Sequence, residues 1–99
     1  MNELPARTLG RSSLQVSILG LGCNNFGRRG TVTETQAGTT AVIDTAEDVG
    51  VTLLDTADMY GAHPGQSEAF IGVALAGPRD RFVLATKFGH PAVNMGIAD

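Results

Sequence analysis

Short apolar runs alternate with longer amphipathic segments along this chain. Residues 18–22, 51–54 and 82–86 are short, mostly apolar runs, which is typical of strands buried on both faces of a parallel sheet. Residues 35–49 and 67–76 instead carry apolar side chains at helical spacing. The pattern therefore predicts three parallel, adjacent strands and two helices that lie on one side of them.

Residues that commonly begin and end helices flank both helical segments. Residues 33–36 have the form of a capping box, and Gly50 is a good terminator for the first helix. Ser67 can cap the second helix, and Glu68 is favourable in its first turn. Gly77 and the proline after it are expected to end that helix.

A short hairpin is predicted before the first buried strand, within residues 7–19. Leu14, Val16 and Ile18 alternate with polar residues, as in a half-buried strand. Residues 10–13 are rich in turn formers.

The spacing of the strand ends carries the prediction of fold class. Gly22, Asp55 and Lys87 follow one another at intervals of 33 and 32 positions, and an eight-fold βα barrel uses about 31 residues per unit. An open doubly wound sheet has similar spacing, so the interval alone does not decide between the two folds. A three-stranded piece of either sheet would leave both edges unpaired. We therefore expect residues 1–99 to be part of one larger α/β domain rather than a miniature one.

Composition restricts the function classes. Of 99 residues, 42% are hydrophobic and 17% charged, which indicates a globular chain. A net charge of −3 argues against nucleic acid or an anionic membrane as partner, and Arg28 and Arg29 form a basic pair expected in a solvated loop. The single cysteine, Cys23, excludes an intramolecular disulfide and suits a reducing compartment. With no signal peptide or membrane segment in sight, a cytoplasmic protein without a metal site is expected.

Three residues at the predicted strand ends can carry chemistry. Asp55 closes one apolar strand, Lys87 closes the next, and Tyr60 lies five residues after Asp55. The carboxyl ends of parallel strands share one rim, so these side chains can converge. One interpretation is an ion pair that fastens two strands, with Tyr60 as a loop anchor. The other is a general acid, because a nearby ammonium stabilises a phenolate and makes tyrosine a proton donor at neutral pH.

At these residues the chain resembles the aldo-keto reductases. The similarity extends from about residue 7 to residue 89 through four motifs in the same order. They are Leu9-Gly10-Arg11-Ser12 with Leu19-Gly20-Leu21-Gly22; Gly50-Val51-Thr52-Leu53-Leu54-Asp55-Thr56-Ala57-Asp58-Met59-Tyr60-Gly61; Ser67-Glu68 with Ile71-Gly72 and Ala74-Leu75; and Val83-Leu84-Ala85-Thr86-Lys87-Phe88-Gly89.

The resemblance implies a (β/α)8 TIM barrel, of which this chain supplies the N-terminal hairpin, about three strands and two helices. It also implies an NAD(P)H-dependent oxidoreductase, usually with NADPH, that reduces an aldehyde or ketone to an alcohol. Asp55, Tyr60 and Lys87 match three of four catalytic residues, with Tyr60 as the proton donor. The fourth is a histidine that the family carries at the end of the next strand. His63 and His90 are expected to be surface loop residues instead.

The resemblance further implies that Gly22, Cys23 and Asn24 contact the nicotinamide end of the cofactor, together with Asp55. The thiol of Cys23 is expected to pack behind the rim. The partner would be a small carbonyl substrate, and the oligomeric state stays open.

Three alternatives remain. Residues 20–25 partly match the fingerprint of a doubly wound dehydrogenase, but the third glycine is missing. A non-catalytic homologue, similar to the β subunits of voltage-gated potassium channels, would share the barrel. The isolated chain could also be an inactive fragment, because it lacks the histidine and most of the cofactor site.

Overall fold

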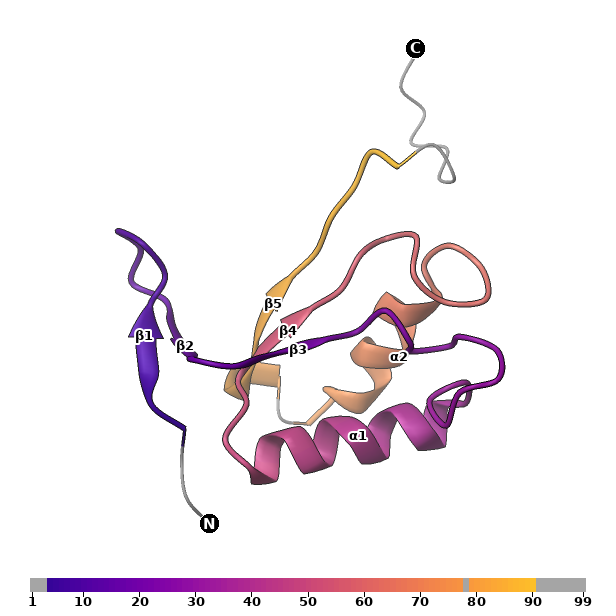
Figure 1. Cartoon of the computed structure of the whole chain (residues 1–99), viewed down its shortest axis with the longest axis horizontal. Coiled ribbons are helices and arrows are strands. Elements are labelled where there is room, and N and C mark those ends of the chain that lie inside the picture. The colour runs from indigo at the N-terminus through magenta and orange to yellow at the C-terminus, as the bar shows by residue number, and fades with distance from the viewer. Residues whose placement is uncertain (1–3, 78, 91–99) are drawn as a thin grey trace.

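The computed structural model of the chain describes residues 4–77 and 79–90 (Figure 1). Two short strands form an antiparallel hairpin, and three further strands form a separate parallel sheet. In chain order the elements are β1 (Ala6–Thr8), β2 (Gln15–Ser17), β3 (Gly20–Gly22), α1 (Gln36–Asp48), β4 (Leu53–Asp55), α2 (Gln66–Ala74), the 3-10 turn η1 (Arg79–Arg81) and β5 (Val83–Ala85).

The parallel sheet confirms the predicted strand order. β3 pairs with β4, and β4 pairs with β5, both in parallel. Leu54 lies opposite Leu21 on one side and Leu84 on the other. Asp55 pairs with Gly22 in the same register. The end of β4 therefore lies between the ends of β3 and β5.

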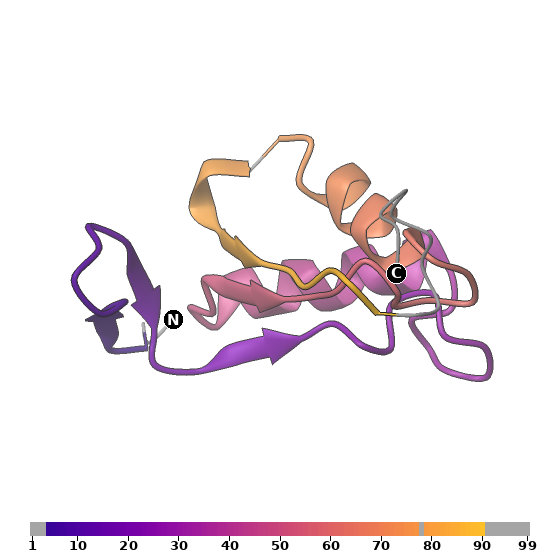
Figure 2. The ribbon, with the colours of Figure 1, turned by 90° about the horizontal axis from the view of Figure 1, so that it is seen from above.

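Both helices cover one face of this sheet, as predicted (Figures 1 and 2). Leu54 points into the layer between sheet and helices and is fully buried. Because side chains alternate along a strand, Asp55 lies on the opposite face, where it is exposed. The core beneath the sheet consists of Cys23, Phe26, Ile43, Leu54, Ile71, Leu75 and Phe82.

The predicted burial on both faces of the strands is not complete within the described residues. Leu84 is 36% exposed in the edge strand β5, and Ile18 and Leu19 are more exposed in the bend before β3. The reason is geometric, since α1 and α2 cover only one face and no described element lies beyond β5.

The predicted hairpin is present, with its turn at Gly10, whose φ is 53°. Of the three alternating apolar residues expected to be buried, only Val16 is buried. Leu14 and Ile18 are about half exposed because β2 covers only three residues and the chain bends after Ser17.

The helix α1 begins later than the capping box predicts. Its N-cap is Thr35, whose side chain accepts a hydrogen bond from the Gly38 N–H at 3.1 Å. Thr33 does not cap the helix, because its hydroxyl donates to the Asn25 carbonyl at 2.6 Å. Gly50 terminates the helix as predicted, with φ of 92° directly after the C-cap.

The prediction that Ser67 caps α2 is wrong. The N-cap is Gly65, which has φ of 87° and no side chain to donate or accept. Ser67 lies inside the first turn beside Glu68, which is in that turn as expected. The helix ends at Ala74, before Gly77, and the proline at position 78 lies outside the described residues.

Neither helix in the described part of the chain is long and apolar enough to cross a membrane.

Candidate active site

Backbone hydrogen bonds continue past the ends of the three parallel strands and hold the rim together. The Cys23 N–H donates to the Asp55 carbonyl at 2.9 Å. On the other side of β4, the Thr56 N–H donates to the Ala85 carbonyl at 2.8 Å, and the Asp58 N–H donates to the Lys87 carbonyl at 3.1 Å. The segment that carries Asp55 is thus paired with the end of β3 on one side and with the segment that carries Lys87 on the other.

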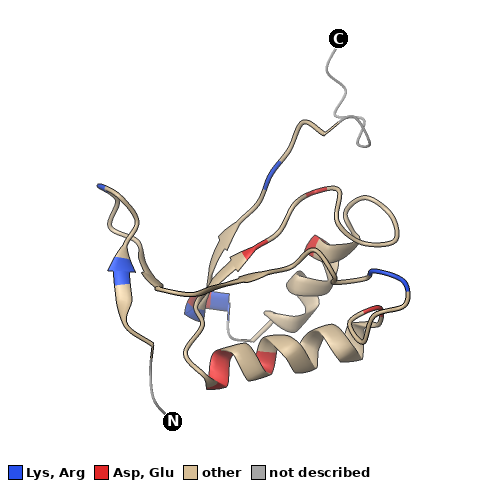
Figure 3. Ribbon diagram, in the orientation of Figure 1, with Lys and Arg blue, Asp and Glu red and all other residues tan. Residues whose placement is uncertain are grey.

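Asp55, Tyr60 and Lys87 meet at this rim. The Lys87 Nζ lies 2.7 Å from Asp55 Oδ1 and 3.3 Å from the Tyr60 hydroxyl oxygen. It also donates to the Thr56 carbonyl at 2.8 Å. In Figure 3 the acidic end of β4 lies next to the basic segment that follows β5.

The hydrogen bonding of this group assigns its protons. An ammonium has three hydrogens, and Lys87 has three oxygen acceptors, so every hydrogen has a partner. The Tyr60 oxygen accepts from Lys87, which leaves the phenol proton available for another acceptor. The arrangement can therefore donate a proton from Tyr60 while a cation stays beside the oxygen.

Electrostatics favour the charged form of the lysine. The hydrogen bond that Lys87 donates to the Asp55 carboxylate raises the pKa of Lys87 above its ordinary value, and the Tyr60 contact acts in the same direction. Both side chains of the ion pair are about half exposed, at 52% for Lys87 and 51% for Asp55. The pair is thus accessible from solvent and lies at the surface of the rim.

Sequence reasoning did not identify the Thr56 carbonyl as the third acceptor of Lys87. The contribution comes from a backbone oxygen at 2.8 Å, and no side-chain type signals it. Only the pairing of β4 with β5 brings that carbonyl to the lysine.

The residues expected to hold a cofactor form the exposed end of β3. Gly22 and Asn24 are exposed, and a Cβ placed on Gly22 would meet nothing within 4 Å. Cys23 between them is fully buried, and its thiol donates to the Leu21 carbonyl at 3.4 Å. Burial raises the pKa of Cys23 to about 12, so the group is a neutral thiol that packs behind the rim, as expected.

A cavity of about 400 Å³ opens beside Tyr60 and Lys87. Apolar atoms of Met59 and Phe88 contribute to its lining, and so does His90. His63 is exposed, with Nδ1 3.3 Å from the Pro64 carbonyl. The two histidines are therefore on loops, and only His90 borders the cavity.

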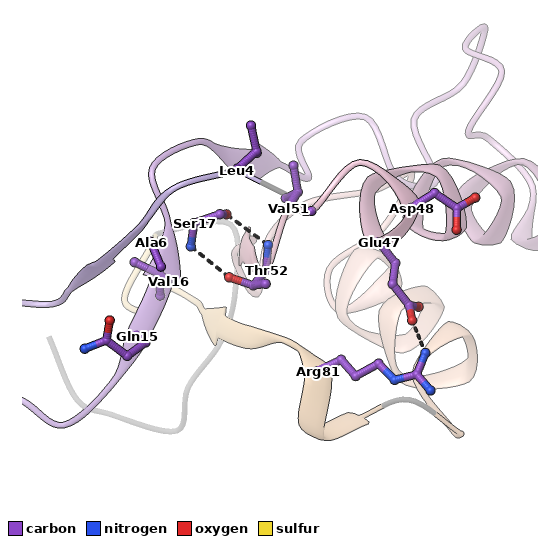
Figure 4. A pocket seen from close by; sticks show the side chains of 11 residues that line it. Leu4, Ala6, Gln15, Val16, Ser17, Glu47, Asp48, Val51, Thr52 and Arg81 are labelled. Carbon is purple, nitrogen blue, oxygen red and sulfur yellow. Dashed lines mark hydrogen bonds and ion pairs between the residues drawn. The ribbon is translucent and has the colours of Figure 1, made fainter. Parts of the chain in front are cut away.

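A second cavity, of about 440 Å³, lies at the opposite ends of the strands (Figure 4). Ser17 and Thr52 exchange hydrogen bonds of 2.8 and 2.9 Å there and fasten the hairpin to the start of β4. Arg81 and Glu47 form an ion pair on the far side of the same cavity. These contacts tie elements together at the end of the sheet that is remote from Tyr60 and Lys87.

The fold and the rim together define a class of protein: parallel βα units with an aspartate, a tyrosine and a lysine joined at the carboxyl ends of the strands. The model of the aldo/keto reductase family matches residues 18–98. The chain belongs to the aldo-keto reductase family.

Comparisons with individual proteins agree with this family assignment. The chain is 38% identical over 84 residues to YqkF of Bacillus subtilis, named an uncharacterised oxidoreductase, and this match covers 85% of the chain and 25% of that protein. It resembles the holo form of the aldo-keto reductase AKR11C1 from Bacillus halodurans with a TM-score of 0.74 and 38% identity, over 88% of this chain and 26% of that one. PA4992 of Pseudomonas aeruginosa, provisionally named an aldo-keto reductase, gives a TM-score of 0.72 at 37% identity, over 85% and 31%.

The chain thus spans about a quarter to a third of these relatives. Its parallel strands and helices form an N-terminal portion of the barrel fold of this family.

Proposed function

We propose that the complete protein is an NAD(P)H-dependent oxidoreductase that reversibly reduces an aldehyde or ketone to an alcohol. The observation that carries this proposal is the position of Lys87 Nζ, 2.7 Å from Asp55 and 3.3 Å from the Tyr60 hydroxyl oxygen. Membership of the aldo-keto reductase family supports the same reaction class.

In this proposal Tyr60 protonates the carbonyl oxygen of the substrate. The phenol proton is not used in the contact with Lys87, so it is available to the substrate oxygen. Once the proton leaves, the ammonium of Lys87 is already in place beside the phenolate and stabilises it. Asp55 orients the ammonium and keeps it charged.

The exposed end of β3 fits a flat ring lying on the rim. Gly22 presents no side chain there, Asn24 is exposed beside it, and the Asp55 carboxylate borders the same surface. We assign Gly22, Asn24 and Asp55 to the nicotinamide end of the cofactor, with Cys23 contributing through its backbone. A nicotinamide cofactor bound there would supply the hydride for the carbonyl carbon, and NADPH is preferred as the usual cofactor of the family.

The substrate is proposed to be a small carbonyl compound. The cavity beside Tyr60 has apolar lining from Ala57, Met59 and Phe88, which suits an apolar substituent on the carbonyl.

The proposed location of the protein is the cytoplasm. The single cysteine is unpaired and buried, which agrees with a reducing compartment.

The test is to replace Tyr60 with phenylalanine in the intact protein. Tyr60→Phe removes the proton donor and keeps the ring, so we expect kcat for a reactive aldehyde to fall by about 10²- to 10⁴-fold. Binding of NADPH, followed by cofactor fluorescence, should remain near that of the wild type. Wild-type turnover by the variant would refute the assignment of Tyr60.

A further inference from the structure

We propose that Ser67 is a positioning residue for Tyr60, and that its buried hydroxyl sets the distance between the phenol and Lys87. The inference rests on the proposed role of Tyr60 as proton donor. It replaces the capping role that the sequence suggested for Ser67, since that role belongs to Gly65.

The first observation is the set of contacts that Ser67 makes. Its side chain is fully buried, and its Oγ donates to the Cys23 carbonyl at 3.1 Å. The same Oγ lies 2.9 Å from Thr56 Oγ1. Because the only hydroxyl proton of Ser67 is engaged by Cys23, Thr56 must be the donor in this second bond. The Ser67 N–H donates to the Tyr60 carbonyl at 3.1 Å.

These contacts join three segments through one residue. Cys23 follows β3, Thr56 follows β4, and Tyr60 lies in the loop that leads to α2. Cys23 is in turn bound to Asp55 through its backbone N–H. Ser67 thus connects the strand end proposed to meet the cofactor with the loop that carries the proton donor.

The neighbouring residue strengthens this connection. Gln66 Oε1 accepts from the Ala62 N–H at 2.6 Å, within the loop that carries Tyr60. Its side chain packs so closely against Gly27 and Gly61 that a Cβ on either glycine would come within 2.7 Å of it. The start of α2 therefore holds the loops after both β3 and β4.

Removal of the hydroxyl has a defined consequence. Ser67→Ala leaves the Thr56 hydroxyl without its acceptor and removes one of the two donors to the Cys23 carbonyl, which keeps the Phe26 N–H at 3.2 Å. The backbone bond to Tyr60 still pulls the loop with α2. We expect Tyr60 to move away from Lys87 and kcat of the intact protein to fall by about 10- to 100-fold. The phenolate then loses part of its stabilisation, so the alkaline limb of the pH profile of kcat should move to higher pH.

Thr39→Val is the matched control. Thr39 is also fully buried, and its hydroxyl also donates to a loop carbonyl, that of Thr33 at 2.9 Å. This bond ties a loop to α1 and does not contact Tyr60. We expect the two variants to lower Tm by similar amounts, with kcat and the pH profile unchanged in Thr39→Val.

Thr56→Val tests the same hydrogen bond by removing its other partner. It removes the donor to Ser67 and preserves the shape of the side chain, so it should change kcat and the pH profile in the same direction as Ser67→Ala, by a smaller factor. If Ser67→Ala fails to fold, Thr56→Val decides whether this hydrogen bond positions Tyr60.

Tyr60→Phe is measured alongside to separate the two proposals. If Tyr60→Phe is inactive while Ser67→Ala and Thr56→Val keep the wild-type kcat and pH profile, Ser67 has no positioning role and the proposed function stands. If Tyr60→Phe keeps its activity, both proposals fail.

Discussion

The ammonium of Lys87 meets a carboxylate, a phenol and a backbone carbonyl at once, and the chain has no other lysine. Each of the three acceptors comes from the segment 55–60, so a single stretch of chain holds the whole environment of the cation. Asp55 stabilises the charged form of Lys87, so the contribution of this ion pair to the stability of the protein should depend on pH.

We expect the Lys87–Asp55 ion pair to persist into the alkaline range. The pKa of Lys87 is raised in the folded protein, so its contribution to stability is complete below the ordinary lysine pKa and is lost as pH rises through the higher folded value. The Tm difference between the intact protein and Asp55→Asn should be constant from about pH 7 to about pH 9 and decline above about pH 10.4.

Glu47→Gln is the control for this pH titration. Glu47 pairs with Arg81, and arginine does not lose its proton in this range. The Tm difference for Glu47→Gln should therefore show no alkaline decline. A parallel decline in both variants would attribute the effect to general alkaline unfolding.

The thiol of Cys23 should be unreactive in the folded protein. It is fully buried, and its pKa of about 12 leaves almost no thiolate at about pH 8. Iodoacetamide labelling, mapped to the Cys23 peptide by mass spectrometry, should be slow in buffer and fast in urea. Equal rates under the two conditions would contradict the burial of this residue.

At the residue scale, the contacts of charged side chains are easier to predict from the sequence than the contacts of hydroxyl groups. Asp55 and Lys87 interrupt apolar runs at strand ends, and this contrast with their neighbours marks them along the chain. The hydroxyls of Thr33 and Ser67 suggest helix caps because capping is a short-range pattern. Their actual partners, Asn25 and Cys23, lie 8 and 44 residues away, and only the fold brings them close.

At the scale of the elements, the loop between β4 and α2 requires glycine at position 61. Gly61 has φ of 116°, and a Cβ there would lie 2.7 Å from the Gln66 Cβ. Gly61→Ala should therefore lower the free energy of unfolding of the intact protein by about 1–3 kcal/mol, through backbone strain and overlap. Chemical denaturation of wild type and variant measures the difference.

Gly77→Ala is the control for glycine removal in general. A Cβ at Gly77 would meet nothing within 4 Å, and this residue does not have the positive φ of Gly61. Its substitution should leave stability within about 0.5 kcal/mol of the wild type. If Gly61→Ala is equally neutral, the close packing of Gln66 does not constrain the loop.

Element order was predictable from the chain, and element length was not. The apolar runs indicate three parallel strands in the observed order, because a doubly buried strand needs consecutive apolar residues. Regular pairing nevertheless covers only three residues in each strand. The ends of the runs lie in bends and at the rim, where apolar character continues although the ladder has stopped.

At the scale of the whole molecule, two apolar grooves flank the described structure. One lies between α2 and β5 and includes Ile71, Leu75 and Leu84. The other, along α1, includes Leu21 and Val42. In a barrel both edges of a three-stranded segment continue into further βα units, and the match to this chain covers only 31% and 26% of two solved family relatives.

We expect residues 1–99, expressed alone, to lack cooperative folding and carbonyl reduction. Each exposed Leu or Val side chain forgoes about 1.5–3 kcal/mol of burial, and a few of them remove the ~5–15 kcal/mol by which a domain is stable. A thermal melt followed by circular dichroism, with NADPH absorbance recorded against a reactive aldehyde, tests both statements. A sharp melt with protein-dependent NADPH oxidation would contradict them.

The contacts of the proposed acid–base group are close in sequence. Lys87 lies 32 residues from Asp55 and 27 from Tyr60, whereas closing a barrel joins strands some 200 residues apart. Loop closure over a short stretch has the smaller entropic cost, so these bonds need less ordering of the chain than the contacts that close the barrel. When a whole barrel folds, the proposed acid–base group should therefore form its contacts before the strands that close the barrel find one another.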